Sequence, residues 1–144
     1  MVDFNKIPDW WPLCPGFDCP QKETCLRHAA YTQAPHGVTR WTCVLPQALT
    51  DGTCSYYRKD ERVLMARGFS KLFDQLHSRD LRHDIRIALT DYFNSKGSYY
   101  RYRNGEQQLS PEQQQEVRRI VSQKGFDDDF DFDEYIECFD FTSL

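Results

Sequence analysis

Residues 14–28 read CPGFDCPQKETCLRH, and this stretch decides what kind of fold the N-terminal third of the chain can have. It places Cys14, Cys19 and Cys25 among prolines and a glycine, which interrupt any long helical period. A compact segment with so little regular structure needs cross-links, and metal ligation supplies them in a reducing compartment. We therefore expect a loop-rich, cysteine-containing region over residues 1–55, held by a metal ion.

Zinc is the metal that this pattern favours, with Cys54 as the fourth ligand. Three thiolates close together in a loop bind Zn²⁺ and lower the entropic cost of recruiting a distant fourth ligand. His28 is the alternative fourth ligand, although it follows Cys25 after two residues where three-cysteine, one-histidine fingers usually have three. The Cys19-Pro20 step makes an iron–sulfur cluster the alternative cofactor, although the two-residue spacings of ferredoxins are missing. With no metal, the same cysteines would be reduced side chains that fill a core.

Composition and length predict one folded domain over residues 1–144. Hydrophobic residues make up 40% of the chain and aromatic residues 15%, more than a disordered chain contains. No segment approaches the roughly 20 apolar residues of a membrane-spanning helix, and the first residues lack the apolar run of a signal peptide. We therefore expect a cytoplasmic protein, in which disulfides are disfavoured.

The net charge of -4 conceals an uneven distribution along the chain. Residues 56–124 carry fourteen Lys and Arg against nine Asp and Glu, whereas residues 125–144 carry eight acidic residues and no basic one. A basic middle followed by an acidic tail is typical of a nucleic-acid-facing segment or of an intramolecular pairing. The alternative is that the two segments form differently solvated faces.

Hydrophobic periodicity predicts a helical body over residues 56–124. Apolar residues recur at helical spacings from Met65 to Leu76 and again from Leu81 to Phe93, with a break near Ser78. Asn94 and Gly97 should end the second of these helices.

A third helix has the clearest start signal in the chain. Ser110 can cap it, Pro111 suits the first helical position, and Gln113 can complete a capping box. The segment 125–144 alternates aromatic and acidic residues and should dock as a short strand or helix. The expected fold is mainly α, with the cysteine-containing region packed on three to four helices and followed by this acidic aromatic segment.

Residues 99–106, YYRYRNGE, form the best candidate for nucleic-acid binding. Interleaved tyrosine and arginine can stack on bases and contact phosphates or guanine edges. The context of a break, this element, a glycine and a capped helix resembles the recognition half of repressor-type helix-turn-helix domains, over about a quarter of the chain. The residues concerned are Tyr99, Tyr100, Arg101, Arg103 and Asn104. Alternatively, the tyrosines pack in the core and the arginines pair with the acidic tail.

Catalytic motifs are missing from the sequence, which favours a non-enzymatic protein. It contains no Gly-x-Ser-x-Gly, no phosphate-binding glycine loop and no His-Glu-x-x-His. The enzymatic alternative would need an open coordination position at the metal or a reactive thiolate. The acidic run 127–133 does not fit a calcium loop, because Phe132 stands where the sharp turn needs glycine and Cys138 where the bidentate glutamate belongs.

Four motifs together resemble a family of small uncharacterised bacterial proteins. They are Cys-x4-Cys-Pro-x4-Cys-Leu-Arg from Cys14, Cys-x-Tyr-Tyr-Arg from Cys54, Tyr-Tyr-Arg-x-Arg-x-Gly-Glu from Tyr99 and Leu-Ser-Pro-x-x-Gln from Leu109. The resemblance implies a bacterial cytosolic origin and makes Cys14, Cys19, Cys25 and Cys54 the shared set, without Cys43 and Cys138. It implies no activity.

The sequence thus predicts a non-enzymatic, metal-binding protein whose helical body offers a surface to DNA or to a protein partner. One alternative is a protein–protein interaction module in which the cysteines are purely structural and the acidic tail is the working surface. The other is an iron–sulfur or thiol-based sensor. No small-molecule substrate is evident from the sequence.

Overall fold

The computed structural model describes residues 2–142 and divides the chain into two compact units. Unit 1 comprises Met1–Arg62 and Phe139–Leu144, and unit 2 comprises Val63–Cys138. The chain therefore passes from unit 1 to unit 2 once and returns once. The expected single domain over the whole chain stays a prediction, because two compact units can still fold as one.

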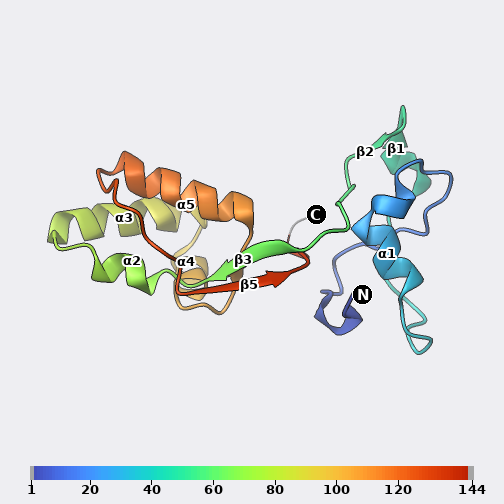
Figure 1. Cartoon of the computed structure of the whole chain (residues 1–144), viewed down its shortest axis with the longest axis horizontal. Helices are drawn as coiled ribbons and strands as arrows, with labels where there is room; N and C mark the ends of the chain where they lie inside the picture. Colours follow the sequence, from blue (N-terminus) through green and yellow to red (C-terminus); the bar gives the residue numbers. More distant parts are fainter. Residues whose placement is uncertain (1, 143–144) are drawn as a thin grey trace. The chain divides into compact units, whose positions relative to one another are not determined.

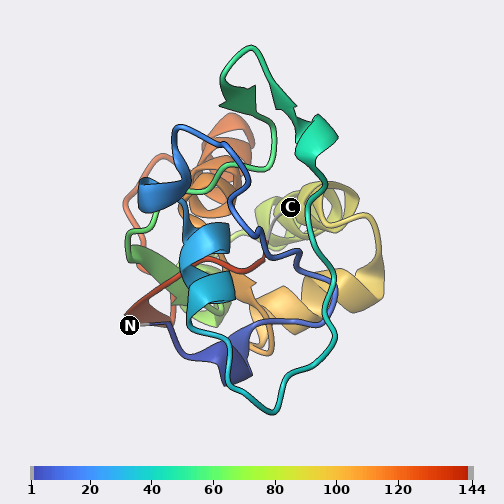
Figure 2. The same ribbon diagram turned by 90° about the vertical axis from the view of Figure 1, so that its right-hand side faces the viewer.

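Unit 1 is loop-rich, and its elements are short (Figure 2). Antiparallel pairing joins two two-residue strands, with Leu49 opposite Cys54 and Thr50 opposite Thr53. The elements are η1 (Phe4–Lys6), η2 (Lys22–Thr24), α1 (Leu26–Thr32), η3 (Pro46–Ala48), β1 (Leu49–Thr50) and β2 (Thr53–Cys54).

Trp11 is the centre of a small hydrophobic core in unit 1. Its side chain is fully buried, and its ring meets that of Phe141 edge to face at 4.9 Å. The indole N–H of Trp41 donates a hydrogen bond to the carbonyl of Trp11 at 3.0 Å. The remaining buried residues of this core are Val2, Phe4, Ile7, Leu13, Leu26 and Ala30. A core with so few apolar side chains contributes limited stability, so a further cross-link would stabilise this unit.

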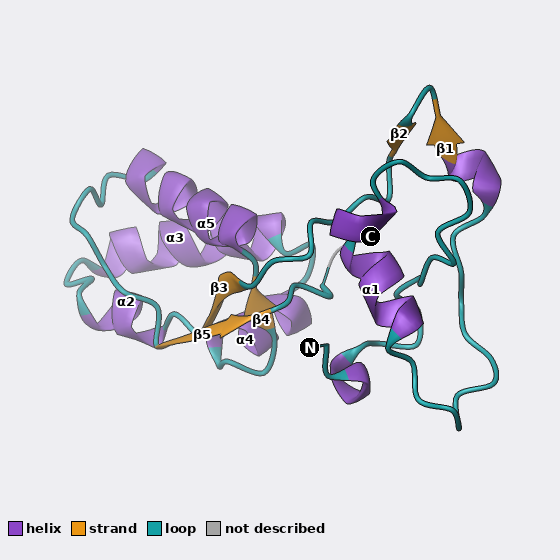
Figure 3. Cartoon of the chain, turned by 45° about the vertical axis from the view of Figure 1, so that its right-hand side comes forward, coloured by secondary structure: helices purple, strands orange, loops and turns teal. Residues whose placement is uncertain are grey.

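Unit 2 combines helices with a three-stranded antiparallel sheet (Figures 1 and 3). The strand order is β4-β3-β5, and α3 and α5 lie side by side. The elements are β3 (Val63–Arg67), α2 (Ser70–Asp74), α3 (Arg79–Tyr92), α4 (Lys96–Arg103), β4 (Gln108–Leu109), α5 (Pro111–Gln123) and β5 (Glu134–Cys138). The expectation of a mainly α fold is therefore wrong, because the protein is mixed α and β.

The error lies in the first expected helix, whose first residues belong to the strand β3. Gly68 follows this strand with φ of +75°, a left-handed conformation that glycine adopts at little cost. Beyond it, α2 carries Leu72 and Phe73 into the core, at the helical spacings that the sequence shows. The strand itself is specified by β5, which pairs with all of β3 from Val63 opposite Cys138 to Arg67 opposite Glu134. A partner so distant in sequence leaves no local signal.

For the other two expected helices, the end at Asn94 and the start at Ser110 are confirmed. The Ser78 hydroxyl accepts a hydrogen bond from the backbone N–H of Leu81 and caps α3, and Asn94 ends the same segment with φ of +68°. Gly97, however, lies inside α4. The capping box of α5 is complete, since Ser110 and Gln113 exchange side-chain-to-backbone hydrogen bonds of 3.2 and 2.9 Å.

The part of the acidic aromatic segment up to Cys138 belongs to unit 2 and contributes to its core. Phe130 and Phe132 are buried in the same cluster as the apolar faces of α3 and α5. Arg118 donates hydrogen bonds to the Phe130 carbonyl at 2.6 Å and to the Tyr135 hydroxyl at 3.2 Å. Of the two forms expected for this segment, a short strand or a helix, the structure shows the strand, β5.

Asp133 caps the N-terminus of α2, although the two are far apart in the sequence. Its carboxylate accepts hydrogen bonds from the Ser70 hydroxyl at 2.6 Å and from the backbone N–H groups of Ser70 and Lys71 at 3.0 and 2.9 Å. Its Oδ2 would lie 2.5 Å from a Cβ at Gly68, so only glycine leaves room for this cap.

Replacing this cap should destabilise unit 2 measurably. We expect Asp133→Ala to lower the free energy of unfolding by about 1 kcal/mol, because α2 loses its only side-chain acceptor within the described residues. Urea unfolding followed by circular dichroism measures the change. The matched control is Asp131→Ala, an exposed aspartate two residues away, which should leave the midpoint unchanged. Equal effects of the two exchanges would show that charge, and not the cap, is responsible.

Candidate metal centre

The four cysteines expected to bind a metal line one small cavity in unit 1. Cys14, Cys19, Cys25 and Cys54 all contribute to its wall, together with His28. Its volume is about 20 Å³, room for about one water-sized body. Of the remaining cysteines, Cys43 is exposed and Cys138 lies on β5 in unit 2, so neither belongs to the lining.

Backbone contacts bring the cysteines together from three separate segments. The N–H of Cys14 bonds to the Arg27 carbonyl at 3.2 Å, and the N–H of Cys19 closes a tight turn onto the Gly16 carbonyl at 2.9 Å. Cys25 precedes α1 and forms a β-bridge with Lys59. Cys54 is the last residue of β2, which forms a hairpin with β1.

Gly16 shapes the turn that follows Cys14. Its φ is +98°, and its N–H donates a hydrogen bond to the Cys14 sulfur at 3.4 Å. A Cβ at this position would lie 2.7 Å from Cε1 of His28, so the imidazole packs where only glycine fits. A backbone N–H directed at sulfur stabilises the thiolate form, which is the form that binds a metal.

His28 lies at the wall of the cavity with one ring nitrogen engaged. Its Nδ1 is 3.1 Å from the Cys14 carbonyl, and its ring stacks with that of Tyr31 at 6.3 Å. A metal-ligating histidine often bonds a backbone carbonyl in this way through its second nitrogen. His28 therefore serves either as an alternative ligand or as the packing partner of Gly16.

The thiols of Cys19, Cys25 and Cys54 lie close enough to Cys14 to influence its protonation. Burial raises the pKa of Cys14 above its ordinary value of 9.0, and negative charge on Cys25, Cys19 and Cys54 raises it further. The N–H of Gly16 acts in the opposite direction. A bound cation would remove this mutual repulsion by neutralising the thiolates.

Arg27 is a buried cation at the wall of the same cavity, and sequence reasoning missed it. Its side chain is 1% exposed, with the guanidinium 4.2 Å from the centre of the Trp11 ring. Nε donates to the Tyr56 carbonyl at 2.5 Å and Nη1 to the Pro12 carbonyl at 2.9 Å. Nη2 has no hydrogen-bond partner within the described part of the chain. The sequence signal was its place in the Cys-Leu-Arg motif, directly after Cys25.

The electrostatic surroundings of the cavity are positive. Burial, together with the charge of Arg58, lowers the pKa of Arg27 to about 10, although the thiolates of Cys25 and Cys54 act in the opposite direction. Lys22 lines the cavity as well, and the lining, all of it described, includes no Asp or Glu. The negative charge that could balance Arg27 here is that of the cysteines.

The cysteine side chains do not already form a coordination shell. Over residues 2–142, no group of three or more His, Cys, Asp or Glu side chains is arranged so that it could hold a metal ion as it stands. The backbone places the four thiols around one space, and ligation would require their side chains to turn toward a common centre.

The tyrosine- and arginine-rich residues proposed for nucleic-acid binding lie on and after α4. Tyr99 is fully buried, Tyr100 is half-buried, and Arg103 stacks its guanidinium 4.4 Å above the ring of Phe73. Arg101 and Asn104 are exposed, and Arg101 bonds to Ser98 within the helix. In the described residues neither arginine forms an ion pair with the acidic tail. DNA binding thus stays a prediction that rests on Tyr100, Arg101 and Asn104.

The comparisons with known proteins place the chain in a family. The model of a family of unknown function, DUF6078, matches residues 1–141, so the chain belongs to this family. No curated protein and no solved structure matches the chain. None of the described helices has the length and apolar character needed to cross a membrane.

Proposed function

We propose that the chain is a non-enzymatic zinc protein in which Cys14, Cys19, Cys25 and Cys54 hold one Zn²⁺. The observation that carries this proposal is the burial of Arg27 beside these cysteines. A guanidinium at 1% exposure, with no carboxylate partner in the described part of the chain, is costly because a buried charge needs an opposite charge nearby. Four thiolates around Zn²⁺ form a group with two net negative charges, which would supply it.

The dimensions and contents of the cavity support the same proposal. A volume of about 20 Å³ suits a single ion and excludes an iron–sulfur cluster unless the walls move apart. Four cysteine ligands would close the coordination of Zn²⁺, as in structural sites, and leave no position for a substrate. The metal would act as the cross-link that the small core of unit 1 needs.

The fourth ligand has two candidates, Cys54 in this proposal and His28 as the alternative. Substituting Co²⁺ for Zn²⁺ distinguishes Cys54 from His28, because thiolate ligation produces a strong charge-transfer absorption whose intensity scales with the number of sulfur ligands. We expect Cys54→Ser to lower this intensity by about a quarter or to abolish binding, since one of four ligands is removed. His28→Ala should retain the full intensity. The opposite ranking would assign the fourth position to His28.

Zinc affinity should fall as pH falls. Each cysteine must lose its proton to bind Zn²⁺, and burial holds the pKa of Cys14 above its ordinary value of 9.0. Each proton released contributes about a tenfold change in affinity per pH unit. Competition with a zinc-binding dye, measured between about pH 6 and 8 with the dye's own titration subtracted, gives the slope.

The metal-free protein should respond to pH in the opposite sense. A thiol whose pKa is raised by folding stabilises the folded state while it is protonated, and that contribution is lost as pH rises above 9.0. Any fraction of unit 1 that stays folded without the metal should therefore decrease further in alkaline solution, whereas zinc should protect the folded state there. A pH-independent zinc affinity would contradict thiolate ligation.

A further inference from the structure

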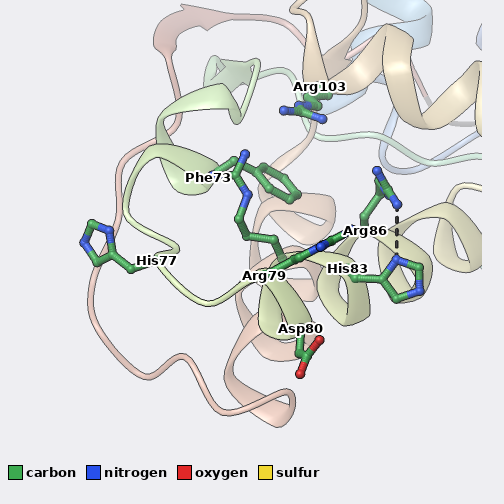
Figure 4. A pocket seen from close by; sticks show the side chains of 8 residues that line it. Phe73, His77, Arg79, Asp80, His83, Arg86 and Arg103 are labelled. Carbon is green, nitrogen blue, oxygen red and sulfur yellow. Dashed lines mark hydrogen bonds between the residues drawn. The ribbon is translucent and has the colours of Figure 1, made fainter.

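Unit 2 contains an open groove of about 600 Å³ whose lining is strongly basic. Arg79, Arg82 and Arg86 reach it from one face of α3, and Arg103 reaches it from the end of α4. Figure 4 shows Arg79, Arg86 and Arg103 among the lining side chains. Asp80 is the only acidic residue of the lining, and Figure 4 shows its carboxylate pointing away from Phe73. With its two histidines neutral, the groove carries three net positive charges.

None of these four arginines is paired with a carboxylate among the described residues. Several are instead held in place by neutral partners. Arg103 lies 4.4 Å above the ring of Phe73 and bonds to the Tyr99 hydroxyl at 3.4 Å, and Arg86 bonds to Nδ1 of His83 at 3.1 Å (Figure 4). Guanidinium groups fixed in this way lose little freedom when a ligand binds.

The four arginines repel one another, and the position of Arg79 and Arg82 on α3 adds to this unfavourable energy. Arg79 is the first residue of α3 and Arg82 lies one turn further on. The N-terminus of a helix carries partial positive charge, so cations there are unfavourable and anions are favourable. Two guanidinium groups at such a helix end, with those of Arg86 and Arg103 in the same lining, are costly to the free protein, and an anion bound among them relieves the cost.

The surroundings of the groove indicate a compact anion and not a nucleic-acid strand. Unit 2 as a whole carries eleven Lys and Arg against fourteen Asp and Glu, so outside the groove it is net acidic. Nucleic-acid-binding domains are typically basic along a continuous track and offer exposed aromatic rings for stacking. The one aromatic residue in the lining, Phe73, is buried and covered by Arg103.

We propose that this groove binds a compact anion with two or more linked phosphate groups, through Arg79, Arg82, Arg86 and Arg103. The volume lies in the range of small-ligand sites. Guanidinium groups bind phosphate oxygens in bidentate geometry, and the groove's three net positive charges match a di- or triphosphate. Such a group occurs free or as part of a nucleotide. The proposal concerns unit 2 alone and does not rest on zinc binding.

The test is calorimetric titration of the full chain with inorganic tripolyphosphate at low ionic strength. We expect saturable one-to-one binding that weakens with salt, and a loss of about tenfold or more in affinity when Arg79→Gln and Arg82→Gln are combined. This variant removes two cations from the positive end of α3, so it should fold at least as stably as the wild type. The control is the combination of Arg101→Gln with Lys96→Gln, two exposed basic residues outside the groove, which should bind normally.

Further titrations separate the sources of the phosphate. ATP binding more tightly than tripolyphosphate would assign the ligand to nucleotides, equal affinity would assign it to the phosphates alone, and adenosine should not bind in either case. Absence of saturable tripolyphosphate binding would overturn the proposal. Equal losses in the groove variant and the control would do so as well, because they would indicate diffuse attraction. Tighter binding of a single-stranded oligonucleotide, lost with Arg101→Gln, would replace it by a nucleic-acid surface.

Discussion

Chelation of the metal should unfold unit 1 and leave unit 2 folded. The core of unit 1 is small, and much of it is loop, so we expect zinc to contribute about 10 kcal/mol to its stability, the range of structural zinc sites. All three tryptophans, Trp10, Trp11 and Trp41, belong to unit 1. Their fluorescence should therefore shift to the red on chelation, while far-ultraviolet circular dichroism from α3 and α5 persists.

A single cysteine exchange should reproduce the effect of chelation. Cys14→Ser removes one ligand and the sulfur that accepts the Gly16 N–H, so we expect its tryptophan fluorescence to match that of the chelated wild type. Cys43→Ser is the matched control, because Cys43 is exposed and outside the cavity. Wild-type fluorescence in both variants would mean that the cysteines only fill space.

Phe132→Ala should be the most damaging single exchange in unit 2. Its side chain is 1% exposed and packs against Phe130 and Tyr135, with ring centres at 5.4 and 6.2 Å. Truncating a buried phenylalanine leaves a cavity and costs about 3–5 kcal/mol. Urea unfolding followed by the helical circular dichroism signal measures the loss.

The same exchange distinguishes a core role of the tail from a binding role. Asp128→Ala, an exposed position on the same segment, should leave the stability unchanged. If the tail were a detachable arm that covers a binding surface, a chain truncated after residue 125 would stay folded and bind a new partner. We expect it to lose the fold of unit 2, because β3 would lose β5 and the core would lose two phenylalanines.

Local signals in the sequence predicted the parts of the fold that are locally determined. Ser110, Pro111 and Gln113 specify the start of α5 through contacts within one turn, and these contacts form as expected. The strand β3 could not be predicted in this way. Met65 fits a helical face in the sequence, yet its conformation is set by Ile136, its partner on β5 about seventy residues away.

The candidate metal centre could likewise be predicted from the sequence only in part. Its four cysteines could be proposed from spacing, because thiolates are a distinctive ligand type. Arg27 could not, since an arginine next to a cysteine motif is as readily exposed, and only the packing against Trp11 and Tyr56 shows it buried. The basic groove was equally hidden, because Arg103 joins the α3 arginines only through the packing of α4 on α3.

The measurement that tests the zinc proposal most directly is the metal content of anaerobically purified protein, determined by elemental analysis. The wild type and Cys43→Ser should each contain about one zinc per chain, and Cys14→Ser and Cys54→Ser should contain almost none. Wild-type protein free of zinc after purification without chelator, and unable to take up added Zn²⁺, would contradict the proposal and leave Arg27 buried beside cysteines with no ion between them.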